Sequence, residues 1–402
     1  MDVIAGGNAC APRGFRAAGA LGGIKAESTK LDVALVASDR TANAAAVYTT
    51  NRVQAAPLYL CREYLQDGKA QAVVLNSGNA NACTGERGID NARAMSVQVG
   101  RGLGVRSEDV LVCSTGVIGV QLDMDAVQTG IAGVLSGLQE DGGDDAAVAI
   151  MTTDTVPKTS ALSLEIRWDT VCVGGMAKGS GMIAPNMATM LGVITTDANV
   201  PPDLLREILL SAVKRSFNCI TVDGDMSTND TVIALANGAV GGAPIEPNTP
   251  SVAALSEAIE VVCRDLARQI ARDGEGATKL VSIEVTGAAS EEDARQVGLS
   301  VANSSLVKTA VFGRDPNWGR ILCAMGYAGV SIDPQEVAVY LCGTQIYGAG
   351  SGLLFDHKAL VEAMSAADIP ISIDLASGTA RAEIFTCDLS YDYVRINAEY
   401  TT

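Results

Sequence analysis

Short apolar runs, rich in β-branched residues, recur along the first half of the chain and predict strands. These runs are Val33–Ala37, Ala45–Thr49, Ala72–Leu75, Val110–Cys113, Leu162–Ile166, Val171–Val173 and Leu191–Thr195. Several of them alternate with stretches of helical character. The pattern therefore predicts an α/β or α+β fold built from layers of helices and sheets.

Two segments carry the three- and four-residue spacing of apolar positions that is typical of amphipathic helices. The first runs from Pro202 to Ser216 and has proline in its first turn, where the missing amide hydrogen costs nothing. The second opens at Thr249-Pro250 and stops at Gly274. Both segments are therefore predicted to be helices with apolar residues on one face.

Beyond Gly276 the pattern becomes richer in strands and indicates a second domain. The predicted strands are Leu280–Val285, Val337–Leu341, Ile371–Leu375, Ala382–Cys387 and Tyr393–Asn397. Between them, Gly313–Arg320 packs polar residues and a proline around Trp318 and is predicted to be an ordered loop. We expect a catalytic domain over residues 1–278 and a smaller α/β domain over residues 279–402.

Composition restricts the classes of function. The 402 residues are 48% hydrophobic and carry a net charge of −17, which argues against sequence-independent binding of nucleic acid. The ten cysteines are dispersed without a C-x-x-C pair, so a cytoplasmic protein with reduced thiols and no bound metal is expected. No secretory signal or apolar run of about 18 residues is found, so we expect no membrane association. The single histidine, His357, excludes any mechanism that needs two.

The segment from Lys178 to Gly192, KGSGMIAPNMATMLG, is the most informative motif. It places Thr189 directly after the small residue Ala188, between a glycine-rich lysine loop and an apolar strand. Cleavage between Ala188 and Thr189 would give Thr189 a free α-amino group beside its own hydroxyl, the pairing that activates an N-terminal threonine as a nucleophile. The alternative is a glycine turn before a buried strand, with Lys178 at the surface.

Leu111–Gly119 is predicted to be a strand that runs into a turn of small residues at Thr115-Gly116. Backbone N–H groups in such turns are often free to point at an anion. An ordinary strand-ending turn is the alternative. The motif therefore indicates a candidate anion site.

Other segments are weaker when taken alone. Met151–Thr155 indicates a polar turn, and Asp273–Lys279 a helix C-cap. Asp223 and Asp225 lack the glycine and glutamate of an EF-hand, so a hydrogen-bonded turn near the active site is preferred over a metal site. Gly100–Gly104 follows a helix and precedes a strand, the reverse of a dinucleotide fingerprint, and indicates a helix end.

Through these motifs the whole chain resembles the ornithine acetyltransferase family, also called the glutamate N-acetyltransferase family. The resemblance implies an α-β-β-α sandwich like that of self-processing aminopeptidases, and self-cleavage into an α chain 1–188 and a β chain 189–402. It also implies site residues. Thr189 is the expected nucleophile, Thr115 and Gly116 the oxyanion hole, and Glu275 a possible proton carrier; substrate contacts are expected from Thr155, Lys178, Thr189, Glu275, Asn397 and Thr402.

The resemblance further implies acetyl transfer from N2-acetylornithine to glutamate, as part of arginine biosynthesis, through an acetyl-Thr189 ester. It requires no cofactor, although acetyl-CoA is a possible second donor, and it implies a heterotetramer of two α and two β chains. A self-processing aminopeptidase or amidohydrolase, in which water removes the acyl group, is the alternative enzyme. A non-catalytic protein that keeps the fold is a further alternative that no residue favours.

Overall fold

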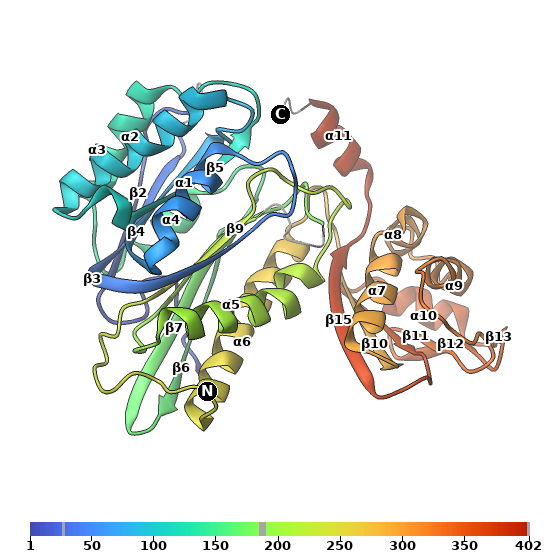
Figure 1. Ribbon diagram of the computed structural model, residues 1–402. Coiled ribbons are helices and arrows are strands. Elements are labelled where there is room, and N and C mark those ends of the chain that lie inside the picture. Colours follow the sequence, from blue (N-terminus) through green and yellow to red (C-terminus); the bar gives the residue numbers. More distant parts are fainter. Residues whose placement is uncertain (26–28, 185–189, 400–402) are drawn as a thin grey trace.

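A computed structural model describes residues 1–25, 29–184 and 190–399 (Figure 1). Within these ranges the chain forms two β-sheets with helices packed against them, which confirms the predicted mixed α/β class. One sheet is built from the first 236 residues and the other from residues after 279. No described helix is both long enough and apolar enough to cross a lipid bilayer.

The first sheet has nine strands among the described residues, in the order β1-β6-β7-β8-β9-β3-β4-β5, and β2 also pairs with β3. They are β1 (Asp2–Val3), β2 (Phe15–Ala20), β3 (Val33–Tyr48), β4 (Lys69–Asn79), β5 (Val110–Val117), β6 (Lys158–Ile166), β7 (Asp169–Lys178), β8 (Leu191–Thr196) and β9 (Thr231–Ala236). The predicted strands of the first half all lie within these elements or at their ends.

Strand β3 joins the two halves of this sheet. It pairs with β2 from Val33 to Ser38, with β4 on both sides of an irregularity between Ala37 and Ala42, and with β9 from Asn43 to Tyr48. The strands predicted at Val33–Ala37 and Ala45–Thr49 both lie along this one strand, which continues through the polar residues between them. Its polar residues Asp39 to Thr41 are exposed at the irregularity, where a polar break in an apolar run resembles a turn.

The two halves of the sheet lie between two layers of helices (Figure 1). The helices are α1 (Ala56–Tyr64), α2 (Gly85–Leu103), α3 (Met124–Ser136), α4 (Gly143–Ala149), α5 (Pro202–Arg215) and α6 (Pro250–Arg272). Neighbouring residues in β8 face different cores: Val193 joins the core of β3, β4 and β5, whereas Ile194 joins the core under α5 and α6. This alternation is typical of a sheet buried on both faces.

The second sheet has six described strands in the order β13-β12-β11-β14-β10-β15. They are β10 (Leu280–Ala288), β11 (Ala338–Leu341), β12 (Thr344–Gly348), β13 (Ser351–Gly352), β14 (Asp368–Asp374) and β15 (Ala380–Cys387). Its helices are α7 (Glu291–Ala302), α8 (Ser305–Phe312), α9 (Trp318–Gly326) and α10 (His357–Ala363), and α11 (Tyr391–Glu399) follows the last strand.

Two predictions for this part are wrong. The expected strand Tyr393–Asn397 lies in helix α11. Its β-branched and aromatic residues favour a strand, but no strand in the described part of the chain pairs with this segment, whereas a helix satisfies its own backbone. The expected loop Gly313–Arg320 ends in a helix. The Asn317 side chain caps α9 by accepting from the Arg320 N–H at 3.1 Å, so Trp318 is already helical.

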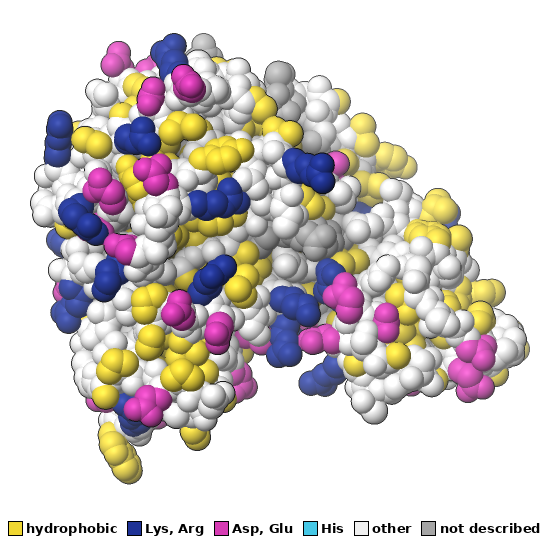
Figure 2. Space-filling model, in the orientation of Figure 1, with side chains coloured by type: hydrophobic (Ala, Val, Ile, Leu, Met, Phe, Trp, Pro, Cys, Tyr) yellow, Lys and Arg dark blue, Asp and Glu magenta, His cyan; other side chains and the backbone are white. Residues whose placement is uncertain are grey.

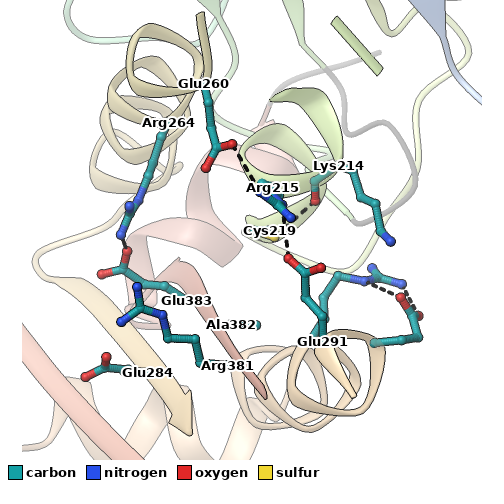
Figure 3. Close-up of a pocket in the computed structure, with 12 residues that line it drawn as sticks. Lys214, Arg215, Cys219, Glu260, Arg264, Glu284, Glu291, Arg381, Ala382 and Glu383 are labelled. Carbon is teal, nitrogen blue, oxygen red and sulfur yellow. Dashed lines mark hydrogen bonds and ion pairs between the residues drawn. The ribbon is translucent and has the colours of Figure 1, made fainter. Parts of the chain in front are cut away.

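A charged pocket of about 450 Å³ lies where α5 and α6 meet α7 and β15 (Figure 3). Arg215 bridges Glu260 at 3.6 Å and Glu291 at 3.0 Å, and Arg264 pairs with Glu383. Figure 2 shows acidic and basic side chains gathered at this junction. Since these groups are partly exposed, each pair contributes only about 0–1 kcal/mol. We interpret the pocket as a contact between the two parts of the chain.

Candidate active site

The residues of the candidate oxyanion hole lie on strand β5. Thr115, which is buried, and Gly116 lie near its C-terminal end. Gly116 has a φ of +132°, and a Cβ at this position would lie 2.3 Å from the carbonyl carbon of Gly78 in the adjacent strand. Only glycine fits this close approach between two strands. The structure thus explains the glycine at the position where the resemblance implies an oxyanion donor.

Lys178 ends strand β7 and reaches the same place. Its Nζ donates to the Thr115 hydroxyl oxygen over 3.4 Å, and it lies 3.8 Å from a carboxylate oxygen of Asp154. The side chain is buried, so the prediction's alternative of a surface lysine is wrong. Because the ammonium can only donate, the Thr115 hydroxyl keeps its own hydrogen for an acceptor. The structure therefore brings the candidate oxyanion donor and a cation together.

Burial lowers the pKa of the Lys178 ammonium, and Lys158 acts in the same direction. Asp154 opposes this change, as Glu275 and Asp230 also do. A buried lysine ammonium is suited to pair with an anion, because surroundings that exclude water strengthen an ion pair.

Glu275 and Asn397 meet although 122 positions separate them. The Asn397 amide donates to a Glu275 carboxylate oxygen over 2.8 Å, and the Glu275 N–H donates to the Ser180 carbonyl over 2.8 Å. A Cβ at Gly181 would lie 2.5 Å from both Glu275 carboxylate oxygens, so the glycine makes room for the acid. Helix α11 thus returns toward the signature segment, and the C-terminal region is not a frayed tail up to Glu399.

Thr155 is hydrogen-bonded to Asp273, the first residue of the segment predicted to cap a helix. Its N–H donates to Asp273 over 3.0 Å, and its hydroxyl also donates to this carboxylate. Asp273 lies just after the end of α6, so the predicted helix cap and the predicted polar turn are in contact. Thr155 is therefore held in place by an acid rather than left to rotate freely.

Asp154 is a further carboxylate of this region. It accepts from the N–H of Gly179 over 2.7 Å, from Thr152 over 3.0 Å and from the Lys158 ammonium over 2.7 Å. Burial alone would raise its pKa, but Lys178 and Lys158 together lower it below the ordinary value. Asp154 is consequently ionised at neutral pH.

Ala188 and Thr189, the predicted cleavage site and nucleophile, lie outside the described residues, as does Thr402. The residues on either side of the gap are anchored. Asp223 accepts from the N–H of Met182 at 2.6 Å and of Ile183 at 2.9 Å. It also accepts from the Asp225 N–H at 3.1 Å, the local hydrogen bond of the turn expected there. The Met190 N–H donates to Asp230 over 3.0 Å.

Asp230 is fully buried, and its second carboxylate oxygen has no partner in the described part of the chain. Burial raises the pKa of Asp230 well above its ordinary value, and the hydrogen bond from Met190 opposes this only in part. This acid lies beside the residue that follows the predicted nucleophile, and sequence reasoning assigned it no role.

Titration of Asp230 makes stability depend on pH. The pKa of Asp230 in the folded protein exceeds the unfolded value of 3.8, so the folded state binds the proton more tightly. The free energy of unfolding therefore falls as pH rises from about 4 through the folded pKa. The slope is at most about 1.4 kcal/mol per pH unit. Asp230→Asn removes this component. We expect the melting temperature of the variant to fall less with rising pH than that of the wild type; equal slopes would contradict the assignment.

A second prediction concerns the oxyanion donor. Thr115→Ala removes the hydroxyl while β5 and the Gly116 N–H remain, and we expect a loss of about 10²–10³-fold in kcat. Thr115→Ser, which keeps the hydroxyl, is the matched control and should lose less than about tenfold. Steady-state kinetics of purified variants would check this, and unchanged turnover in Thr115→Ala would remove Thr115 from the site.

Comparison with known proteins gives the family. A family model described as the ArgJ family matches residues 16–402. The arginine biosynthesis bifunctional protein ArgJ of Symbiobacterium thermophilum is 52% identical over 403 residues, covering 100% of both chains, and that of Caldanaerobacter subterraneus is 48% identical over 395 residues, covering 97% of this chain and 98% of its own.

Among solved structures, that of arginine biosynthesis bifunctional protein ArgJ from Bacillus halodurans is 41% identical with a TM-score of 0.51. It covers 52% of this chain and 98% of its own. The family match spans nearly the entire sequence, including every described residue of the candidate site. The chain belongs to the ArgJ family.

Proposed function

We propose that this protein is an acetyltransferase of arginine biosynthesis that moves the acetyl group of N2-acetylornithine to glutamate, giving ornithine and N-acetylglutamate. Its relatives are named as arginine biosynthesis bifunctional proteins. The observation that carries the proposal is the contact of the buried Lys178 ammonium with the Thr115 hydroxyl, which sets a carboxylate-binding cation beside an oxyanion donor.

We propose that the enzyme first cuts itself. The Thr189 hydroxyl attacks the Ala188 carbonyl, the amide bond breaks with a proton moving to the Thr189 nitrogen, and water hydrolyses the resulting ester. Chains of 188 and 214 residues result, and the second is about 53% of the sequence. That share is close to the 52% of this chain that the solved Bacillus halodurans chain covers with nearly its full length.

The acetyl transfer then proceeds in two halves. The Thr189 Oγ attacks the acetyl carbonyl as its proton moves to the Thr189 α-amino group, and the Thr115 hydroxyl and Gly116 N–H stabilise the oxyanion. The ornithine amine leaves with a proton, and Thr189 keeps the acetyl group as an ester. The glutamate amine attacks this ester, loses a proton and regenerates the Thr189 hydroxyl.

In this proposal Glu275 and Lys178 bind the charged groups of the substrates. Lys178 pairs with the carboxylate that both amino acids share. The Asn397 amide occupies one Glu275 oxygen and leaves the other able to bind the substrate ammonium or exchange a proton with it. Thr155 lines the same region, and we propose that Thr402 completes it, which the return of α11 toward Glu275 supports.

A hydrolase would use the same nucleophile but let water remove the acyl group, so the requirement for acceptor separates the two activities. Ornithine release from N2-acetylornithine should depend on glutamate, and equal rates with and without glutamate would overturn the transferase. Acetyl-CoA as donor in the same assay tests the second activity. We propose two copies of each chain in solution, which sedimentation of the cleaved protein would test.

A further inference from the structure

A fully buried lysine, Lys158, lies behind the candidate site at the start of β6. Its Nζ donates to Asp154 over 2.7 Å, to Asp273 over 2.6 Å and to the Val156 carbonyl over 3.2 Å. These three acceptors match the three donors of an ammonium group. A charge this far from water persists only with such complete pairing.

Each aspartate on Lys158 holds a different residue proposed to bind substrate. Asp273 accepts from both the N–H and the hydroxyl of Thr155. Asp154 accepts from the N–H of Gly179, which follows Lys178, and lies 3.8 Å from the Lys178 ammonium. Lys158 therefore connects Thr155 and Lys178 through one buried ion cluster, although it touches neither.

Charge in the cluster is balanced. Asp154 and Asp273 supply two negative charges, and Lys158 and Lys178 supply two positive ones. Without Lys158, both carboxylates would be left with Lys178 as the nearest cation in the cluster. The Lys178 ammonium would then be drawn toward Asp154 and would be less available to a substrate carboxylate.

We propose that Lys158 is a positioning residue that holds Asp154 and Asp273 so that Lys178 stays free to pair with the carboxylate of an α-amino acid substrate. This rests on the proposed function. It predicts that charge balance, rather than packing alone, controls how tightly acetylornithine and glutamate bind.

The test compares Lys158→Met with the charge-balanced pair Lys158→Met/Asp273→Asn. We expect the single change to raise KM for glutamate by about 30-fold or more, as expected when a buried charge pair is broken. The double variant should recover about fivefold of this loss, because one unpaired carboxylate is removed. Rates are divided by the concentration of folded, cleaved enzyme, so that kcat and KM are separated from losses in folding.

The pH profile gives a second readout. The charged groups that face Lys178 include Asp154, Lys158, Glu275 and Asp230, and the Lys25 ammonium, which also interacts with Asp154. Removing the like charge of Lys158 should raise the pKa of Lys178 and move the alkaline limb of kcat/KM to higher pH in Lys158→Met. A lysine with only a structural role would lower the yield of folded protein and leave this limb in place.

Lys279→Met is the matched control, because Lys279 is also buried but its ammonium donates to the carbonyls of Met364 and Ala366, in the second part of the chain. It should lower the melting temperature without changing KM. The proposal is overturned if Lys158→Met shows the same behaviour, or if the double variant binds glutamate no better than the single one.

If Lys158→Met does not fold, the test uses the double variant only. A KM for glutamate at least about fivefold above that of the wild type supports the proposal, and a KM within about twofold of the wild-type value overturns it. The wild-type assay is run first. Glutamate-independent ornithine release there would refute the proposed function, whereas an active wild type with unaltered variants would refute only the role of Lys158.

Discussion

Thr189→Ala should give an uncut chain of 402 residues and reduce acetyl transfer by roughly 10⁴-fold or more, since the change removes the nucleophile of both reactions. Intact mass and ornithine release on the same sample check the two effects together. The anchors on either side, Asp223 and Asp230, remain in this variant, so the fold should be retained.

Thr189→Ser is the matched control, because serine keeps a hydroxyl beside the amine that cleavage would create. We expect it to cut itself and transfer acetyl groups at a reduced rate. If the Thr189→Ala protein is uncut but transfers acetyl groups at the wild-type rate, another group carries the acetyl ester. If it is cut, a residue other than Thr189 performs the self-cleavage.

Lys178→Met should lower kcat/KM by roughly 10³-fold, because it removes the buried cation proposed to hold the substrate carboxylate. The loss should lie mainly in KM for both acetylornithine and glutamate. Asp154 retains Lys158 in this variant, at 2.7 Å, so the acid is not left unpaired. Steady-state kinetics with each substrate varied in turn measures the effect.

Lys69→Met provides the comparison for a lysine outside the site, since Lys69 is exposed at the start of β4. It should keep both kinetic constants. If Lys178→Met bound glutamate as well as the wild type does, the carboxylate would have to be held by other residues, and the proposed substrate orientation would be wrong.

Local sequence patterns predicted helices and strands well where the apolar periodicity extended over many residues. Helices α5 and α6 begin at the predicted prolines and end within two residues of the predicted positions. The pattern failed at α11, where aromatic and β-branched residues favour a strand but the partner strand is missing. Whether such a partner exists is a tertiary property that no local window contains.

The family resemblance predicted Lys178, Thr115, Glu275 and Asn397, and the structure places them as two contacting pairs. Their assigned roles remain predictions, as do the cleavage site, the absence of a cofactor and the cytoplasmic location. Sequence reasoning missed the buried Lys158 that lies behind these site residues. Lys158 resembles any surface lysine in the sequence, because its burial depends on pairing with Asp154 nearby in the chain and with Asp273, which only the fold brings to it.

The most direct test is to mix the cleaved enzyme with N2-acetylornithine alone, stop the reaction and determine the masses of both chains. The proposal predicts one acetyl group on the 214-residue chain, at Thr189, and its transfer when glutamate is added. An acetyl group at another residue would contradict a covalent acetyl-threonine mechanism. So would the absence of any acetylated chain, if ornithine is formed only when glutamate is present.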